Sequence, residues 1–186
     1  MEKYLNDLTQ ALLKVEKEKY IDVIGINTND NLYQQNAENA FTAELFHQFR
    51  VIMEMTENRN YYRNLVLHFD INKERLRGRP DIVLHFAQNN QDDQRMYVEV
   101  KTTPSPNLNE DLRKLFYAVA TGNSGLNYCS GVLIVGRSNY ITTVTNIKND
   151  LQTNRKSGSP LLKKLFLFHF TSDIIPAYTF QSFTTL

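Results

Sequence analysis

The feature that most constrains the fold is a change of hydrophobic period in the middle of the chain. In residues 64–70, 81–86 and 95–101, apolar side chains occupy every second position, which is the period of a half-buried β-strand. Gly78 and Pro80 precede the second segment, and the polar loop AQNNQDDQ separates it from the third. The pattern predicts three successive strands, of which the second and third form an antiparallel hairpin.

Segments with helical period lie on both sides of these strands. A stripe at three- and four-residue spacing predicts a helix over residues 3–19, the Asn-rich residues 27–36 predict a turn, and a second helix is expected over residues 36–55. Asn107 can cap a third helix, and residues 131–136 read as a buried strand. The helix positions expected in the core are Leu5, Leu8, Leu12 and Val15, then Ala37, Phe41, Leu45, Phe49 and Ile52, and finally Leu112, Leu115, Phe116 and Val119.

The end of the chain adds a helix or ordered loop over residues 141–156 and a strand ending in LFLFHF. The order of segments predicts an α/β fold with a mixed central sheet flanked by helices. We expect one domain over residues 1–186, because this length suits a single core. Within it, residues 1–35 form a helical arm, residues 36–136 the core and residues 137–186 an addition of helix and strand.

Composition limits the classes of function. The chain is 41% hydrophobic and 22% charged, its apolar runs are too short to span a bilayer, and its charged N-terminus lacks the apolar stretch of a secretory signal. We therefore expect no membrane association. The single cysteine, Cys129, cannot form an intramolecular disulfide, which fits a cytoplasmic location.

The net charge of +1 gives no overall attraction to a polyanion, so nucleic acid would have to bind through a local basic patch. The alternative is that the basic residues are scattered, solvated surface. The candidates for a patch are Arg75, Arg77, Arg79, Lys148, Arg155, Lys156, Lys163 and Lys164.

Three polar residues stand out against the alternating pattern of the strands. Glu99 and Lys101 point to the same face of the third strand, and Asp81 begins the second strand. If the two strands pair, the carboxylates of Asp81 and Glu99 approach each other. Hard cations such as Mg²⁺ bind one or two carboxylates together with water and phosphate oxygens. A lysine beside such an ion can orient or deprotonate a water, or neutralise charge on a phosphate.

Pro80-Asp81 followed by Glu99-Val100-Lys101, within a helix, three strands, helix and strand, resembles the PD-(D/E)XK nuclease superfamily. The resemblance covers roughly residues 36–136 and implies a restriction-endonuclease-like αβββαβ core with N- and C-terminal additions. It also implies a Mg²⁺-dependent DNA endonuclease, with Mn²⁺ as a substitute ion. Asp81, Glu99 and the Val100 carbonyl would bind the metal, and Lys101 would be catalytic. The alternative is an inactive module with this fold that binds nucleic acid or a protein.

Many members of that superfamily add a glutamate from the helix before the first strand. Glu38 and Glu44 are the two candidates here. Glu38 falls inside the apolar stripe of the predicted helix, close to Leu45, whereas Glu44 lies towards the edge of the stripe. Because a carboxylate within an apolar stripe needs a partner, we prefer Glu38 and keep Glu44 as the second choice.

The remaining polar residues carry weaker signals. His85 shares the face of Asp81 but lies too far along the strand to share its metal, and no pair of thiols is available for zinc. Arg113 and Lys114 could reach substrate phosphates, although an exposed helix face explains them equally well. Cleavage of both DNA strands would favour a homodimer, for which the apolar stripe of residues 3–19 offers a contact. Packing of that stripe against its own domain is the simpler use.

Overall fold

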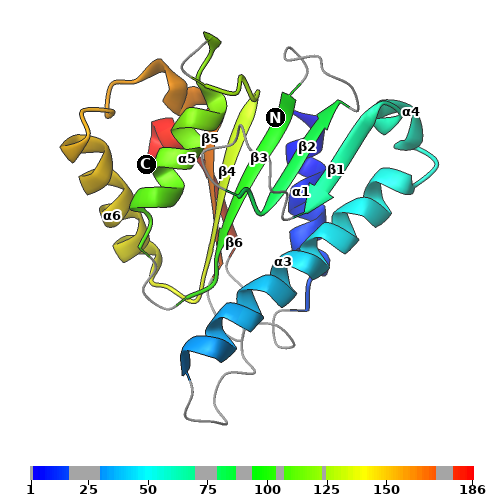
Figure 1. The fold of residues 1–186 in the computed structure, drawn as a ribbon, viewed down its shortest axis with the longest axis horizontal. Coiled ribbons are helices and arrows are strands. Elements are labelled where there is room, and N and C mark those ends of the chain that lie inside the picture. Colours follow the sequence, from blue (N-terminus) through cyan, green and yellow to red (C-terminus); the bar gives the residue numbers. More distant parts are fainter. Residues whose placement is uncertain are drawn as a thin grey trace.

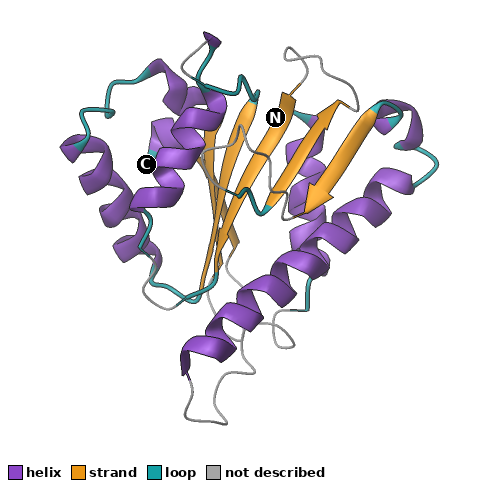
Figure 2. Ribbon diagram, viewed as in Figure 1, coloured by secondary structure: helices purple, strands orange, loops and turns teal. Residues whose placement is uncertain are grey.

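The computed structural model describes residues 2–16, 30–69, 79–86, 94–103, 107–122, 125–170 and 178–186, with the side chains of residues 30–37 and 178 excepted. It is an α/β structure built on one six-stranded mixed sheet, with helices on both faces (Figures 1 and 2). The strands are β1 (Leu65–Phe69), β2 (Ile82–Phe86), β3 (Gln94–Lys101), β4 (Ser130–Gly136), β5 (Leu165–Phe170) and β6 (Tyr178–Ser182).

The strands lie in the sheet in the order in which they occur in the chain. β1, β2 and β3 pair antiparallel, which confirms the predicted hairpin. β3, β4 and β5 pair parallel, and β6 returns antiparallel to β5. The parallel strand β4 is buried along its whole length, as expected for a strand covered on both faces.

Helices cover the sheet from two sides. They are α1 (Lys3–Lys14), α3 (Asp30–Glu54), α4 (Arg59–Tyr62), α5 (Asn109–Val119) and α6 (Tyr140–Thr153), together with the 3₁₀ turns η3 (Pro160–Lys164) and η4 (Phe183–Thr185). α1 and α3 pack on the face that carries Ile82, Val98 and Ile134, whereas α5 and α6 pack on the face that carries Val83 and Leu133. Strand alternation thus divides the core into two apolar layers.

The predicted helix faces are the buried ones wherever the structure describes their side chains. Two helix ends differ from the prediction. α1 stops at Lys14 rather than continuing to residue 19, of which residues 17–19 lie outside the described part. α3 begins at Asp30, so the predicted turn over residues 27–36 is wrong from that position onward, and the boundary drawn at residue 36 falls inside a helix. Asn-rich composition is a weak signal that tertiary context overrides.

Polar contacts fix the helices of the first layer to the sheet and to one another. The Tyr4 hydroxyl of α1 lies 3.0 Å from the Ser130 hydroxyl at the start of β4, and the Tyr62 hydroxyl donates to Asp7 at 2.6 Å. Within the layer, the Phe41 ring of α3 stacks on Phe170 of β5 with ring centroids 5.3 Å apart. These contacts hold α3 in one position along the sheet, which determines where its polar residues lie.

Several strands begin or end at the same end of the sheet, and polar residues lie at these strand ends. β3 and β4 both finish there because they are parallel, and β2 starts there because it is antiparallel to β3. In Figure 1 this is the lower end of the sheet, towards which the first turns of α3 also extend. In the described part of the chain, no helix has both the length and the apolar character needed to cross a membrane.

Candidate functional site

Asp81 and Glu99 face each other across the β2–β3 pair. The last paired residues are Ile82 and Val98, so the next position of each strand places Asp81 opposite Glu99. The backbone N–H of Val100 donates to Asp81 Oδ2 at 2.6 Å, which fixes the carboxylate against β3. The N–H and C=O of one strand residue point to the same edge, so the Val100 carbonyl faces the Asp81 side as well.

Both carboxylates are held in an environment that favours the protonated form. Burial raises the pKa of Asp81 to about 6, although the Val100 N–H and Lys101 oppose this rise. Burial and the neighbouring Asp81 charge together raise the pKa of Glu99 to about 8, against the opposing effect of Lys114. Carboxyl groups with such raised pKa values are typical of functional sites.

Glu99 also has an oxygen that lacks a partner. Its side chain is 1% exposed, and its Oε1 accepts no hydrogen bond of normal geometry from any residue that the structure describes. Tyr97 lies on the same face of β3, and burial raises its pKa, as do the Glu99 charge and a hydrogen-bonding contact with the Glu99 carboxylate. The Tyr97 hydroxyl is therefore the nearest candidate donor to Glu99, although Oε1 lacks a hydrogen bond of normal geometry. A buried acceptor without a donor is costly, so this oxygen is a natural ligand for a cation.

Lys101 is held between carboxylates from two different helices. Its Nζ lies 3.1 Å from Glu38 Oε1 of α3 and 4.0 Å from Asp111 Oδ1 of α5. The other oxygen of Glu38 accepts from the backbone N–H of Thr102 at 3.1 Å. Burial alone would lower the pKa of Lys101, but Asp111 and Glu38 outweigh burial and raise it. Lys101 therefore remains an ammonium at neutral pH.

The helix α5 contributes two side chains that sequence reasoning did not place in the site. Lys114 Nζ lies 2.9 Å from Glu99 Oε2 and 3.6 Å from Asp111 Oδ1. Lys114 was expected on an exposed helix face or at a substrate phosphate, yet its side chain is only 15% exposed. Its neighbour Arg113 is exposed and pairs with Glu110, as expected for a solvated helix face. The (i, i+3) spacing of Asp111 and Lys114 was the available signal.

The donor set fits a hard cation such as Mg²⁺. Asp81, the unpartnered oxygen of Glu99 and the Val100 carbonyl supply three oxygen ligands, and such an ion keeps water or phosphate in its other positions. No group of three or more His, Cys, Asp or Glu side chains is arranged to hold a metal within the described ranges. That finding does not conflict with this set, since only two of its ligands are carboxylate side chains.

Other predicted candidates lie elsewhere. Glu44 accepts from Gln48 within α3 at 2.6 Å, so the structure brings Glu38 and not Glu44 to Lys101. His85 stacks on His68 of β1 with ring centroids 4.9 Å apart, a contact that the sequence pattern did not indicate.

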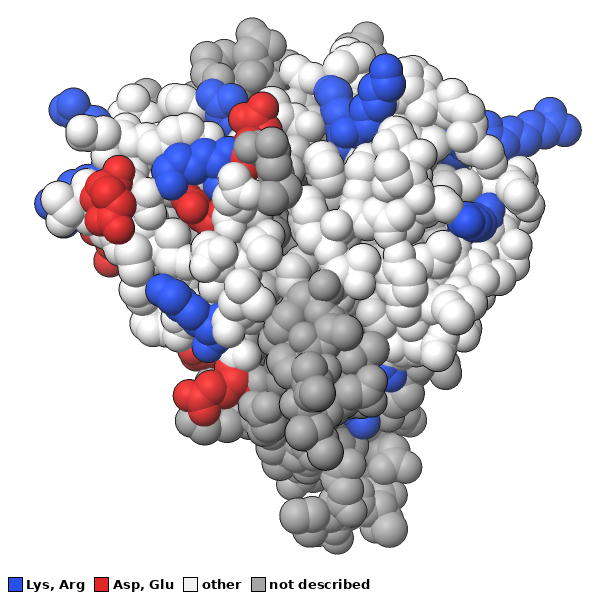
Figure 3. All heavy atoms as spheres, turned by 180° about the vertical axis from the view of Figure 1, so that it is seen from behind, with Lys and Arg blue, Asp and Glu red and all other residues white. Residues whose placement is uncertain are grey.

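The structure describes six of the eight basic candidates, and at least two of these six contact the protein's own residues. Arg75 and Arg77 lie outside the described residues. Lys156 packs over the Phe116 ring at 4.3 Å, and Lys164 donates to the Val119 carbonyl at 3.3 Å. On the face opposite to the view of Figure 1, the coloured Lys and Arg side chains lie apart from one another or in small groups, several of them beside Asp and Glu (Figure 3). The described residues of that face form no broad basic patch.

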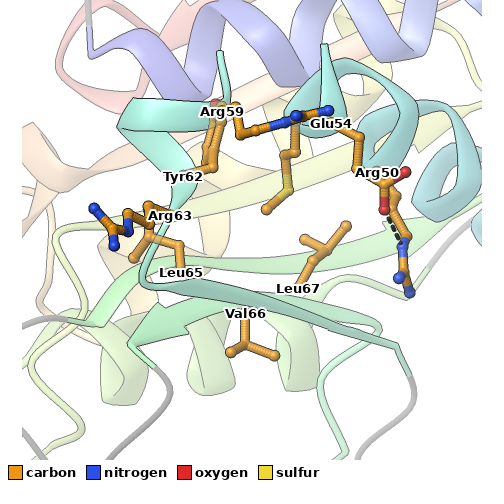
Figure 4. A pocket seen from close by; sticks show the side chains of 9 residues that line it. Arg50, Glu54, Arg59, Tyr62, Arg63, Leu65, Val66 and Leu67 are labelled. Carbon is orange, nitrogen blue, oxygen red and sulfur yellow. Dashed lines mark hydrogen bonds and ion pairs between the residues drawn. The ribbon is translucent and has the colours of Figure 1, made fainter. Parts of the chain in front are cut away.

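A separate hollow of about 380 Å³ lies where α3, α4 and β1 meet (Figure 4). Leu65 and Leu67 line it, and Arg50 and Glu54 form an ion pair of 2.9 Å at its margin. Leu65 pairs with Phe86, at the end of β2 that is remote from Asp81. The hollow therefore contributes nothing to the Asp81–Glu99 group, and its only carboxylate is already paired with an arginine.

The raised pKa of Glu99 predicts that the metal-free protein loses stability as the pH rises. Between its ordinary value of 4.5 and about 8, Glu99 keeps a proton in the folded chain that the unfolded chain has released. Because the folded state binds more protons, the free energy of unfolding falls through this window. Urea unfolding without metal should show a smaller loss between pH 6 and pH 8 for Glu99→Gln than for the wild type.

Glu54→Gln is the matched control, because Glu54 is exposed and forms only a surface ion pair. It should lose as much stability as the wild type over the same pH range. Equal losses in the wild type and in Glu99→Gln would show that Glu99 titrates near its ordinary pKa in the folded chain.

Comparison of the chain with models of protein families, with curated proteins and with solved structures finds no match in any of the three.

Proposed function

We propose that the protein is a Mg²⁺-dependent endonuclease that hydrolyses DNA phosphodiester bonds, with Asp81, Glu99, Val100 and Lys101 at the cleavage site. The observation that carries the proposal is the pairing of the half-buried Asp81 carboxylate with the buried Glu99 carboxylate, both with raised pKa values, beside a lysine that stays protonated. Buried acids of this kind destabilise an empty site, and a bound divalent cation would offset the cost.

The order and pairing of the elements support the same proposal. α3, β1, β2, β3, α5 and β4 follow one another as in the αβββαβ core of the restriction-endonuclease-like fold, with the first three strands antiparallel and the fourth parallel to the third. The candidate residues come from the start of β2 and the end of β3. Fold alone does not determine function, so the proposal depends on the side chains.

Each residue of the proposed cleavage site has a separate role. Asp81, Glu99 and the Val100 carbonyl would hold the ion, which when bound would polarise the scissile phosphate and lower the pKa of a water. Lys101, kept charged by Asp111 and Glu38, donates hydrogen bonds to a phosphate oxygen and neutralises the charge that develops there. Its raised pKa favours this role over removal of a proton from water. Lys114 holds the Glu99 carboxylate in place through Oε2.

The proposal is tested by incubating the purified protein with supercoiled, linear, single-stranded and branched DNA in Mg²⁺ or Mn²⁺. We expect cleavage of at least one substrate, loss of cleavage in EDTA and loss of cleavage in Asp81→Asn. Asp150→Asn is the control, since Asp150 lies on α6 and bonds only Asn154 among the described residues. Intact DNA in every combination of substrate and metal would overturn the proposal.

The ion pairs of the site favour a second candidate function, that of an inactive module that binds nucleic acid or a protein. Glu99 is paired with Lys114 at 2.9 Å and Lys101 with Glu38 at 3.1 Å, so part of the charge is balanced without a metal. Binding of DNA that is unchanged by EDTA and by Asp81→Asn, together with the absence of cleavage, would favour this second function.

A further inference from the structure

Arg137 follows the last residue of β4 and has an unusual backbone conformation. Its φ angle is 56°, in the left-handed region that glycine and asparagine adopt more readily than arginine. Conformations of this kind cost free energy, and they concentrate at functional sites.

The Arg137 side chain is partly buried, and it forms no ion pair with any residue that the structure describes. Its Nη1 is fully buried and has no hydrogen-bond partner in the described part of the chain, although a guanidinium is always protonated. Leaving a buried donor unsatisfied costs free energy, and the cost is greater for a charged group. Because the residue is only partly buried, an anion at the surface could approach the guanidinium, and its negative charge would offset this cost.

Arg137 lies close to the candidate site. Lys101 pairs with Val135 in the parallel β3–β4 register, so Arg137 lies two residues beyond Lys101 on the neighbouring strand. With standard strand spacings, the two Cα atoms are separated by roughly 8 Å. The strand ends share one end of the sheet, from which the chain continues into α6 (Figure 1). The N-terminus of that helix adds a favourable potential for an anion.

We propose that Arg137 binds a backbone phosphate of the DNA, next to the phosphodiester that reaches Asp81, Glu99 and Lys101. The inference rests on the proposed function, because it takes the polyanion to be the substrate. A guanidinium suits this role, since its planar fork can bind two oxygens of one phosphate. Such a contact carries no sequence information, so it positions any DNA in the same way.

The test is binding of a fluorescent duplex by the full chain in EDTA, where no cleavage occurs, over a range of salt concentrations. Arg137→Asn should weaken binding about 10-fold or more and reduce the slope of log affinity against log salt by about 1. Arg137→Lys should fall between the two, because it keeps the charge and loses the fork. The unfolding temperature of Arg137→Asn should equal or exceed that of the wild type, since asparagine suits this φ and the substitution removes the unsatisfied Nη1 donor.

Arg155→Asn is the matched control. Arg155 has nearly the same backbone conformation, with φ of 55°, but it is exposed after α6. It should bind DNA as the wild type does.

The outcomes separate the inference from the proposed function. Unchanged binding and salt slope in Arg137→Asn, or a loss of binding together with a lower unfolding temperature, would overturn the role of Arg137 and leave the nuclease proposal standing. Binding that depends on Arg137 in a protein that cuts no DNA with Mg²⁺ would support the inference and overturn the nuclease. A wild-type chain that does not bind DNA in EDTA would overturn the role of Arg137, and the cleavage test with Mg²⁺ or Mn²⁺ would still decide the nuclease.

Discussion

Replacing Lys101 by methionine is expected to lower the rate of Mg²⁺-dependent DNA cleavage by about 10²- to 10³-fold, the usual cost of removing one preorganised donor from a developing charge. Methionine keeps most of the length and apolar stem of lysine, so the loss reports the ammonium itself. Single-turnover cleavage of the best substrate, with enzyme in excess, measures the step directly. DNA binding in EDTA should change much less than the rate.

The control for this variant is Lys148→Met, which removes an exposed lysine from α6. It should cut DNA at the wild-type rate. A Lys101→Met protein that is folded and cuts within a factor of two of the wild type would remove Lys101 from the cleavage site. The unfolding temperature of each variant shows whether a lost rate reflects a lost fold.

Replacing Glu38 by glutamine is expected to reduce cleavage by about 10- to 100-fold, the range seen when a residue that orients a site residue is lost. Glu38 acts through Lys101 Nζ and the Thr102 N–H, so it is a positioning residue. Because the Glu38 charge also raises the pKa of Lys101, the high-pH limb of the pH–rate profile should move to lower pH in the variant.

Glu44→Gln provides a matched control on the same helix. Glu44 accepts a hydrogen bond from Gln48, and glutamine at position 44 keeps an acceptor oxygen. The rate and the pH profile should therefore match the wild type. If Glu44→Gln lost activity and Glu38→Gln did not, the helix α3 would serve the site through Glu44 and not through the contact described above.

The strands and most helices were predictable because the spacing of apolar residues in each segment matches the period of a strand or a helix. Leu84 and Val98 alternate with polar or oppositely directed neighbours, and the structure pairs their strands as the loop between them indicates. β6 was not predicted, because YTFQS at residues 178–182 alternates as a strand does but contains only two apolar positions, which is a weak signal. The early start of α3 at Asp30 was missed for a different reason: asparagines favour turns locally, while helix continuation depends on the rest of the fold.

The site was predictable only in part, and its chemical roles stay predictions. Strand alternation places Glu99 and Lys101 on one face, and the hairpin brings Asp81 opposite Glu99. Asp111 and Lys114 could not be placed, because a charged pair at (i, i+3) on a helix is usually solvated. Only the packing of α5 on β3 and β4 turns that pair towards the sheet. The strain at Arg137 has no sequence signal, since arginine is not a residue that favours positive φ.

The backbone amides of Val100 and Thr102, both in the site, should exchange their hydrogens at different rates. The Val100 amide bonds the side chain of Asp81, which directly precedes Ile82, the last paired residue of β2, so its exchange should require movement of the β2–β3 pair at this end of the sheet. The Thr102 amide depends on Glu38, a side chain 64 residues away on a helix. A small displacement of α3 would free that amide and leave Lys101 with Asp111 of α5 as its only carboxylate among the described residues. Asp81 and Glu99 would then keep their positions on the strands while the Lys101 ammonium became free to move. Movement of one helix could therefore reposition the lysine while the two carboxylates stay in place.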